Sequence, residues 1–148
     1  MQSAAVYQVK GCVLIHPWQE TTMGLNIASE PYVRLPLDVD AETLGNAVLS
    51  ALGNSGRRVP HPASWNGLGA ARLAAAGVRS ERAFQLSARG IGVERLASLF
   101  RLEPTRNGGA KGAAKGFEPL PELALSLPLA SSAEELGRAV HACFERCA

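Results

Sequence analysis

The residues of this chain best suited to chemistry are its three histidines and three cysteines. His16, His61 and His141 lie far apart in the sequence, and none has a cysteine or carboxylate at a spacing typical of a catalytic or metal site. No serine lies in a Gly-x-Ser-x-Gly motif, in which a sharp turn exposes a nucleophilic hydroxyl. The sequence therefore predicts no catalytic residue, and we expect a binding protein rather than an enzyme.

Two cysteines near the C-terminus are the only other candidates for a metal site. Cys143 and Cys147 are four residues apart and could place two thiolates on one side of a helix. Two thiolates without a second pair of ligands make a weak site, and Cys143 continues an apolar helical stripe. We therefore expect Cys143 to pack in the core, with no metal and no cofactor bound. Cys12 falls within a predicted strand, where a buried and unreactive thiol is expected.

The middle of the chain has features of phosphate binding. Residues 49–116 hold eleven basic residues against three acidic ones, whereas residues 19–48 hold five acidic residues against one arginine. Such blocks occur in proteins that bind nucleic acid or a charged partner, and also where arginines merely solvate helices and strands. The glycine-rich run at 107–116 is followed by no Gly-Lys-Ser/Thr and precedes a predicted strand, so it is more typical of a flexible basic hairpin.

Few aromatic residues accompany these arginines. Phe84 and Phe100 fall on apolar stripes, so no platform for stacking bases is evident. Trp65 follows the segment Pro60-His61-Pro62 and is a candidate for an exposed contact, because tryptophan is common among residues that dominate interfaces. An alternative interpretation is that Trp65 packs over the edge of the core.

Two similar segments provide the frame that must position these residues. Residues 35–48 and 127–140 are identical at nine of fourteen positions without a gap. Each begins with a Leu-Pro-Leu strand end and continues, after a polar capping residue, into an amphipathic helix. Gly45 and Gly137 occupy the same helical position, which predicts a close packing contact, since a helical glycine costs about 1 kcal/mol relative to alanine. Either an internal duplication or two independently capped helices would give this pattern.

The whole pattern predicts an α+β fold in which helices pack over a largely antiparallel sheet. The two strand-to-helix units at 35–52 and 127–144 belong to a single domain that spans residues 1–148. Residues 17–30 are predicted to form a loop with at most one short strand, and residues 57–69 are irregular. The helices are expected at 41–52, 70–76, 81–88 and from 133. The strands are expected at 6–9, 12–15 and 32–37, and then in a meander at 91–95, 99–103, 117–120 and 123–127.

The composition fits a folded cytoplasmic domain. Apolar residues make up 47% of the chain and charged residues 19%, which is ordinary for a globular protein. No apolar run approaches the ~20 residues of a membrane span, and no N-terminal signal peptide is evident. The odd number of cysteines favours reduced thiols.

In order along the chain, several local motifs resemble the immunity proteins of bacterial contact-dependent growth inhibition systems (CdiI). Together they cover roughly residues 40–148, and their order and spacing are more specific than any one of them. Two departures from the family pattern are Glu81, where an aromatic residue is expected, and the hairpin 107–115, which is longer than usual. The motifs are Ala41-Glu42-Thr43-Leu44-Gly45-Asn46-Ala47, Gly77-Val78-Arg79-Ser80 with Ala83-Phe84, Pro104-Thr105-Arg106-Asn107, Lys115-Gly116-Phe117 and Glu135-Leu136-Gly137.

This resemblance implies a cytoplasmic protein, without catalytic residues or cofactor, that binds and neutralises a toxin domain, commonly a nuclease that cleaves tRNA. Because a nuclease holds phosphate with cations, its inhibitor is expected to present carboxylates. The candidate toxin-binding residues are Trp18, Glu20, Glu30, Asp38 and Trp65. The alternative function is a nucleic-acid-binding module that uses the Arg-rich middle of the chain, and a small enzyme is the third interpretation.

Overall fold

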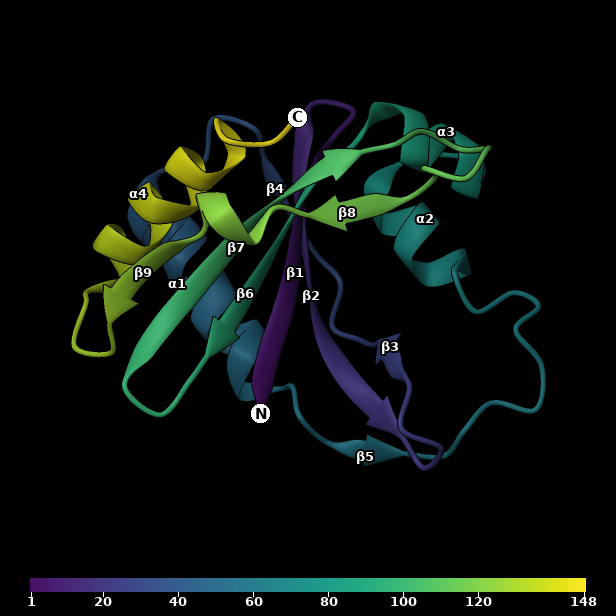
Figure 1. Cartoon of the computed structure of the whole chain (residues 1–148), viewed down its shortest axis with the longest axis horizontal. Coiled ribbons are helices and arrows are strands. Elements are labelled where there is room, and N and C mark those ends of the chain that lie inside the picture. The colour runs from purple at the N-terminus through teal and green to yellow at the C-terminus, as the bar shows by residue number, and fades with distance from the viewer.

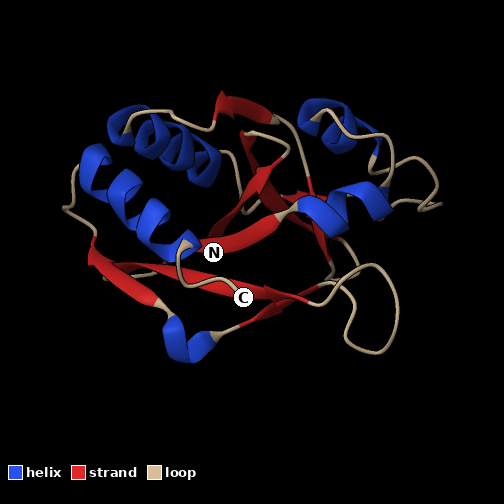
Figure 2. Cartoon of the chain, turned by 90° about the horizontal axis from the view of Figure 1, so that it is seen from above, coloured by secondary structure: helices blue, strands red, loops and turns tan.

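Nine strands form one curled sheet, and four helices cover parts of its two faces (Figure 1, Figure 2). The computed structural model describes every residue from Met1 to Ala148. The sheet is antiparallel except where a two-residue strand joins it, so the predicted α+β fold is confirmed. None of the helices is long and apolar enough to cross a membrane.

The helices begin where the sequence predicts them, because each of three has a capping side chain. Asp40, Ser80 and Ser132 accept a hydrogen bond from the backbone N–H three residues further on. In chain order the elements are β1 (Gln2–Val9), β2 (Cys12–Thr21), β3 (Asn26–Ala28), β4 (Val33–Pro36), α1 (Ala41–Gly53), β5 (Arg58–Val59), α2 (Ala70–Ala76), α3 (Glu81–Ser87), β6 (Arg89–Arg95), β7 (Leu99–Asn107), β8 (Phe117–Pro119), the short 3-10 helix η1 (Pro121–Leu123), β9 (Leu125–Pro128) and α4 (Ala133–Phe144).

The two halves of the chain repeat one arrangement of strands. In the first half, β1 and β2 form a hairpin, β3 and β4 pair with opposite ends of β2, and α1 follows. In the second half, β6 and β7 form the hairpin, β8 and β9 pair with opposite ends of β7, and α4 follows. β1 and β6 join the halves as antiparallel neighbours. The similarity between residues 35–48 and 127–140 thus belongs to a larger repeat, which supports an internal duplication.

Two strands extend further than predicted, and a proline lies within each. The sequence analysis predicts a loop from residue 17 and a strand end at residue 103, but β2 continues to Thr21 and β7 to Asn107. Pro17 and Pro104 lie where the neighbouring strand changes, from β4 to β3 and from β9 to β8. Their carbonyl oxygens accept hydrogen bonds on that side. The N–H and the C=O of a strand residue point to the same neighbouring strand. The N–H that each proline lacks would therefore point to the place where one neighbouring strand ends and the next begins, so the proline removes no hydrogen bond between paired strands.

Three further differences concern the strand pairing and the helix ends. β8 and β9 do not extend a meander, because both pair with β7 and η1 separates them. α3 ends at Ser87, one residue before the predicted end, and Gly90 lies inside β6. The irregular stretch at 57–69 contains β5, which pairs in parallel with the end of β2.

The main core lies between the sheet and the crossed helices α1 and α4 (Figure 2). The helices touch through their first turns: a Cβ added to Gly45 would lie 1.7 Å from the carbonyl oxygen of Ala133, and one added to Gly137 would lie 1.8 Å from that of Ala41. Only glycine leaves room for a backbone at these distances. The predicted close contact at both glycines is therefore confirmed.

The opposite face of the sheet is only partly covered. α2 and α3 lie over one side of it, where Tyr7, Leu14 and Phe84 belong to a second, smaller core. The part of this face formed by the N-terminal half of β1, the C-terminal half of β6 and the first half of β7 carries no helix (Figure 1). Side chains on this part are therefore available for contact with other molecules.

Replacing Gly45 or Gly137 by alanine should lower the free energy of unfolding by about 1–3 kcal/mol, because the new Cβ would overlap a backbone carbonyl. Alanine at an unconstrained helical glycine instead stabilises by up to about 1 kcal/mol. Gly53 in α1 has nothing within 4 Å of an added Cβ, so Gly53→Ala is the matched control. Urea unfolding of the three variants measures these differences. Unchanged stability in both Gly45→Ala and Gly137→Ala would show that the helices can move apart without cost.

Candidate functional site

The strand register brings a distinctive set of side chains onto the uncovered sheet face. Successive residues of a strand point to opposite faces, so alternate positions on β2, β1, β6 and β7 form rows across it. The middle row is His16, Ala5, Gly92 and Glu103. The neighbouring row towards the N-terminus of β1 contains Ser3, Glu94 and Arg101, together with Trp18, two residues beyond His16.

Small residues make the centre of this face hollow. Ala5, Gly90 and Gly92 lie at its base, and aromatic rings surround a space of about 180 Å³; the rings belong to Tyr7, Trp18 and Phe117. A Cβ added to Gly92 would have no neighbour within 4 Å, so the space above this strand is open.

A second hollow lies on the other side of Trp18. It measures about 240 Å³, and its lining includes Ser3, Trp18, Glu20 and Asn26. Trp18 is the residue that the two hollows share, and the second hollow is also lined by Met1, Gln19 and Gly56. We call the two hollows and the Trp18 ring together the sheet groove. Its first hollow is mainly apolar, and its second is polar.

A buried histidine holds the Trp18 ring in place. His16 is fully buried, and its ring lies edge-on to Trp18 with the centroids 4.9 Å apart. Tyr7 and Tyr32 lie on other sides of the imidazole, at 5.8 and 5.5 Å. A ring packed in this way loses little freedom when a partner binds, which lowers the entropic cost of association.

The same histidine contributes no charge to the groove at neutral pH. Its Nδ1 donates a hydrogen bond to the carbonyl oxygen of Pro17 at 2.9 Å, which leaves Nε2 unprotonated and without a partner. Burial lowers the pKa of His16 to about 4; the bond to Pro17 opposes this shift, and the charge of Arg72 adds to it.

Carboxylates border the sheet groove. Glu103 accepts a hydrogen bond from Arg101 at 2.6 Å, whereas neither Glu20 nor Glu94 takes part in an ion pair or side-chain hydrogen bond. The border thus carries three carboxylates against two guanidinium groups, because Arg58 lies opposite Glu20 in the register. Arg101 is bonded to Glu103, and Arg58 donates to the carbonyl oxygen of Thr22. This excess of negative charge favours a cationic partner.

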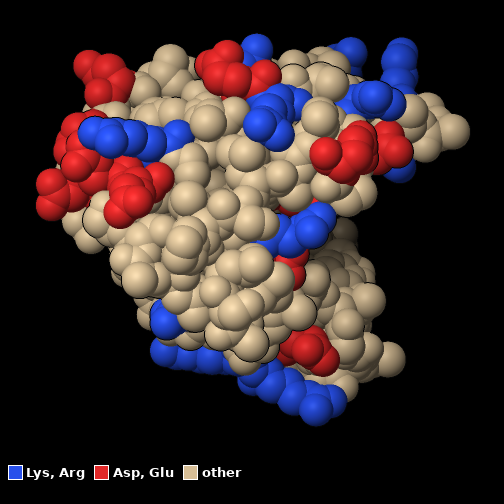
Figure 3. All heavy atoms as spheres, turned by 60° about the vertical axis from the view of Figure 1, so that its left-hand side comes forward, with Lys and Arg blue, Asp and Glu red and all other residues tan.

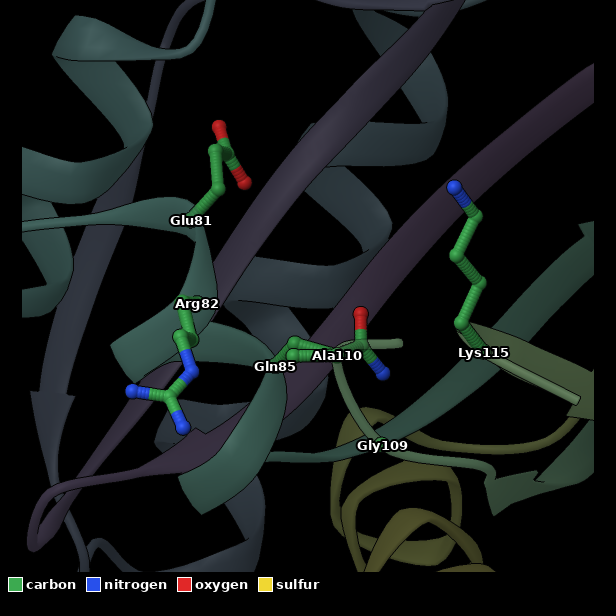
Figure 4. A pocket seen from close by; sticks show the side chains of 7 residues that line it. Glu81, Arg82, Gln85, Gly109, Ala110 and Lys115 are labelled. Carbon is green, nitrogen blue, oxygen red and sulfur yellow. The ribbon is translucent and has the colours of Figure 1, made fainter. Parts of the chain in front are cut away.

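A pocket of opposite character lies between α3 and the hairpin 108–116. Its volume is about 370 Å³, and Arg82 and Lys115 stand on opposite sides of Gln85 within it (Figure 4). Neither cation has an ion-pair partner, whereas Glu81, at the same pocket, pairs with Arg72. This pocket therefore favours anions.

Asn107 fixes the hairpin to α3. Its Nδ2 donates to the carbonyl oxygens of Gln85 and Ala88 at 2.6 and 2.7 Å, and its Oδ1 accepts from Gln85 Nε2 and the N–H of Gly109, both at 2.9 Å. Backbone hydrogen bonds close the loop above it, between Gly108 or Gly109 and Gly116. The hairpin predicted to be flexible thus has a defined path, and only the asparagine before two glycines could have signalled it.

Of the five predicted contact residues, Trp18 and Glu20 lie on the sheet groove, and Trp65 lies on a separate loop. Trp65 is 55% exposed, so the interpretation that it packs over the core is wrong. Its ring stands edge-on to His61 at 5.5 Å, and His61 Nδ1 lies 3.0 Å from Thr21 Oγ1. This contact ties the loop to the end of β2.

The predicted acidic residues do not form one face. Glu30 is exposed just before β4, and Asp38 is exposed just after it. Pro36, two residues before Asp38, pairs with Cys12 at the start of β2. Glu20 lies eight residues further along β2, roughly 26 Å from Cys12 at about 3.3 Å per residue, so Asp38 and Glu20 lie at opposite ends of this strand.

Asp38 belongs instead to a group of acids around the touching first turns of α1 and α4, which also includes Asp40, Glu42, Glu134 and Glu135. Hydrogen bonds from Thr43 lower the pKa of Asp40, and bonds from Ser132 lower that of Glu135. Figure 3 shows a group of carboxylates at the left edge with a basic side chain among them, and a broad uncharged area in the middle of this view. The caps account for much of this acidic group.

The cysteines and buried aromatic residues belong to the cores. Cys143 packs between α4 and the sheet, and burial raises its pKa to about 12, so the thiol is protonated at neutral pH. Cys12 is buried and donates to the carbonyl oxygen of Val9 at 3.0 Å. Phe84 and Phe100 are buried as predicted. No three His, Cys, Asp or Glu side chains converge as the ligands of a metal would.

The sequence analysis missed most residues of the sheet groove. The sequence analysis counts Glu94 and Glu103 within a basic block, and it names Thr105 and Phe117 only in motifs of the resemblance, with Phe117 also at the start of a predicted strand. The alternation of Gly90 and Gly92 in β6 could have predicted a strand face that offers room to other groups, since residues two apart point the same way. The rings of Tyr7 and Phe117 fill that room over Gly90, and it is open over Gly92.

The comparisons with known proteins concern the fold. No family model matches the chain, and no curated protein matches its sequence. A solved protein of unknown function from Neisseria meningitidis superposes with a TM-score of 0.77 at 21% identity, over 99% of this chain and 95% of that one. A chain of the CdiA-CT/CdiI toxin and immunity complex from Yersinia pseudotuberculosis superposes with a TM-score of 0.75 at 15% identity, over 99% of this chain and 97% of that one. The chain therefore has the same overall fold as both.

The stability of the folded chain should decrease between pH 6.5 and about 4, because unfolding lets His16 take up a proton. Its pKa is lower in the folded than in the unfolded state, so this contribution is complete above pH 6.5 and is lost as the pH falls through that window. A shift of this size corresponds to about 3 kcal/mol. His16→Phe should flatten this part of the curve, as measured by urea unfolding across the range.

The same replacement at His61, which lies on an outer loop, controls for the loss of an imidazole. If His16→Phe and the wild type lose stability in parallel between pH 6.5 and 4, the burial of His16 does not govern the acid response.

Proposed function

We propose that this chain is an immunity protein that binds and neutralises the toxin domain of a contact-dependent growth inhibition system. The observation that carries the proposal is the superposition, over nearly the full length of both chains, on a chain from a CdiA-CT/CdiI toxin and immunity complex. The order of the sequence motifs described above supports it independently. We further propose that the protein acts in the cytoplasm.

The functional groups of the chain fit a binding role. The buried imidazole of His16 bonds only to a backbone carbonyl, and Thr105 Oγ1 in the sheet groove donates to the carbonyl oxygen of Gly90 at 2.5 Å. Neither forms the nucleophile–base pair that a hydrolytic site requires. The two hollows and the charged pocket instead offer shape and charge complementarity, which is what an inhibitor needs.

The proposed toxin is a nuclease that cleaves tRNA. A nuclease site is lined with cations that hold phosphate, and the carboxylates around the sheet groove would complement such a surface. This finer proposal rests on the resemblance of the sequence and on that charge.

Co-expression with the toxin domain encoded beside this gene should restore the growth that the toxin alone arrests. The purified partners should form a 1:1 complex with a Kd on the order of nanomolar, which is ordinary for an inhibitor interface of standard size. Colony counts and isothermal titration calorimetry measure the two effects, and an unrelated toxin domain serves as the control. Continued growth arrest and no binding by the folded protein would contradict the proposal.

The nuclease proposal has its own test. Total tRNA incubated with the toxin domain should be cleaved, and one equivalent of this protein should stop the cleavage, as seen on a denaturing gel. Neutralisation of a toxin that leaves tRNA intact would preserve the immunity role and disprove the substrate.

The alternative function, nucleic-acid binding, is favoured by the unpaired Arg82 and Lys115 at the pocket beside α3. It predicts tRNA binding that weakens linearly on a log–log plot of affinity against salt. The immunity role predicts a toxin complex that survives 0.5 M NaCl, because apolar contacts and partly buried charges are screened less. A steep salt slope with random tRNA and no toxin binding would favour the alternative.

A further inference from the structure

We infer that the sheet groove is the surface that receives the toxin, and that its occupant is a basic segment of the partner. An apolar side chain of that segment fills the hollow above Gly92, and arginine or lysine side chains meet Glu20 and Glu94. This inference rests on the proposed immunity function and specifies where the partner binds.

The first argument is the shape of the groove. Its apolar hollow has a base of alanine and glycine, so a partner side chain can reach the strand backbone itself. Trp18 lines both hollows and is only partly buried. A tryptophan held in place by packing against His16 matches the aromatic anchors that dominate interfaces.

The second argument is charge complementarity. Neither Glu20 nor Glu94 forms an ion pair within the chain. Glu20 lines the second hollow, and Glu94 lies opposite Ser3 of the same lining. Arg58 is opposite Glu20 in the register, but its guanidinium donates to the carbonyl oxygen of Thr22. Arg101 is opposite Glu94 in the register, but its guanidinium bonds to Glu103. Two carboxylates are therefore free to pair with cations of a partner, and Trp18 adds a ring face for a guanidinium.

The other charged surfaces fit a basic partner less well. At the first turns of α1 and α4, Asp40 and Glu135 bond to the backbone of their own caps, and Glu134 pairs with Arg138. Asp38 and Glu42 have no ion-pair partner, but neither lines the apolar hollow. The pocket beside α3 carries Arg82 and Lys115 and would repel cations. The sheet groove is thus the surface that combines unpaired carboxylates with an apolar hollow.

Gly92→Leu tests the inference directly, because its side chain would fill the hollow without meeting any atom of the fold near Cβ. We expect the Kd for the purified toxin domain to rise at least 100-fold, with an unchanged melting temperature. Gly53→Leu, at a helix end with equal space for a Cβ, is the matched control and should bind like the wild type. Biolayer interferometry with immobilised toxin domain measures both rates.

A charge variant tests the argument from charge complementarity. It also tests the inference by itself if Gly92→Leu does not fold. Glu20→Lys with Glu94→Lys should slow association at least tenfold in 50 mM NaCl, and the difference should shrink in 500 mM NaCl, because salt screens exposed charges. Glu122→Lys with Glu145→Lys, at exposed positions in η1 and at the end of α4, makes the same change in net charge and is the control.

The outcomes separate the two proposals. If the wild type does not bind the toxin, the immunity function is wrong and the groove assignment falls with it. If the wild type binds, and folded Gly92→Leu and the charge variant bind equally well, the function stands and the groove assignment is wrong. A wild-type dimer that Gly92→Leu converts to a monomer would identify the occupant as a second copy of this chain and would also overturn the assignment.

Discussion

The contact between the first turns of α1 and α4 is the constraint on which the rest of the structure depends. Each helix presents a glycine to the backbone of the other, at Gly45 and Gly137, so the two axes approach more closely than side chains would allow. That approach lets both helices lie on one face of the sheet and bury a common core with its central strands. It also brings two helix N-termini together, and the carboxylates gathered there offset their partial positive charges.

The repeated topology transmits this constraint to the opposite face. The two halves of the chain are exchanged when α1 is replaced by α4 through the glycine contact. On the sheet the same exchange replaces β1 by β6, so the pair Val6–Ile91 takes the place of the pair Val93–Ala4. The pair Ala5 and Gly92 lies at the centre of this exchange, and these two residues are the smallest of the middle row across the sheet. The repeated helices α1 and α4 both lie on one face of the sheet. The opposite face is covered by α2 and α3 alone, which have no counterpart in the second half, and they cover only one side of that face. The sheet groove is thus the part of the repeat that neither half covers.

Much of the fold could be predicted from local sequence, because local interactions determine those parts. Caps and apolar spacing located the starts of α1, α3 and α4, and the repeated glycine indicated the contact between α1 and α4. The prediction failed where a residue's effect depends on a distant strand. Pro17 and Pro104 normally mark strand ends, yet both lie inside long strands, because each faces a gap between two neighbours. Where that gap falls is fixed by tertiary pairing and cannot be inferred from the residues around the proline.

The candidate site was harder to predict than the fold, because charge along a chain does not give charge on a surface. Glu20 and Asp38 belong to one acidic block in the sequence, yet they lie at opposite ends of β2. Glu94 and Glu103 lie in the most basic block, yet alternation turns them onto the same sheet face as Glu20, while flanking arginines such as Arg89 and Arg106 lie away from the hollows. A one-residue change in register would turn each strand's charges to the other face. The sign of the charge on a sheet surface therefore depends on how the strands pair. In this chain, strand pairing places carboxylates from the most basic part of the sequence at the border of the sheet groove.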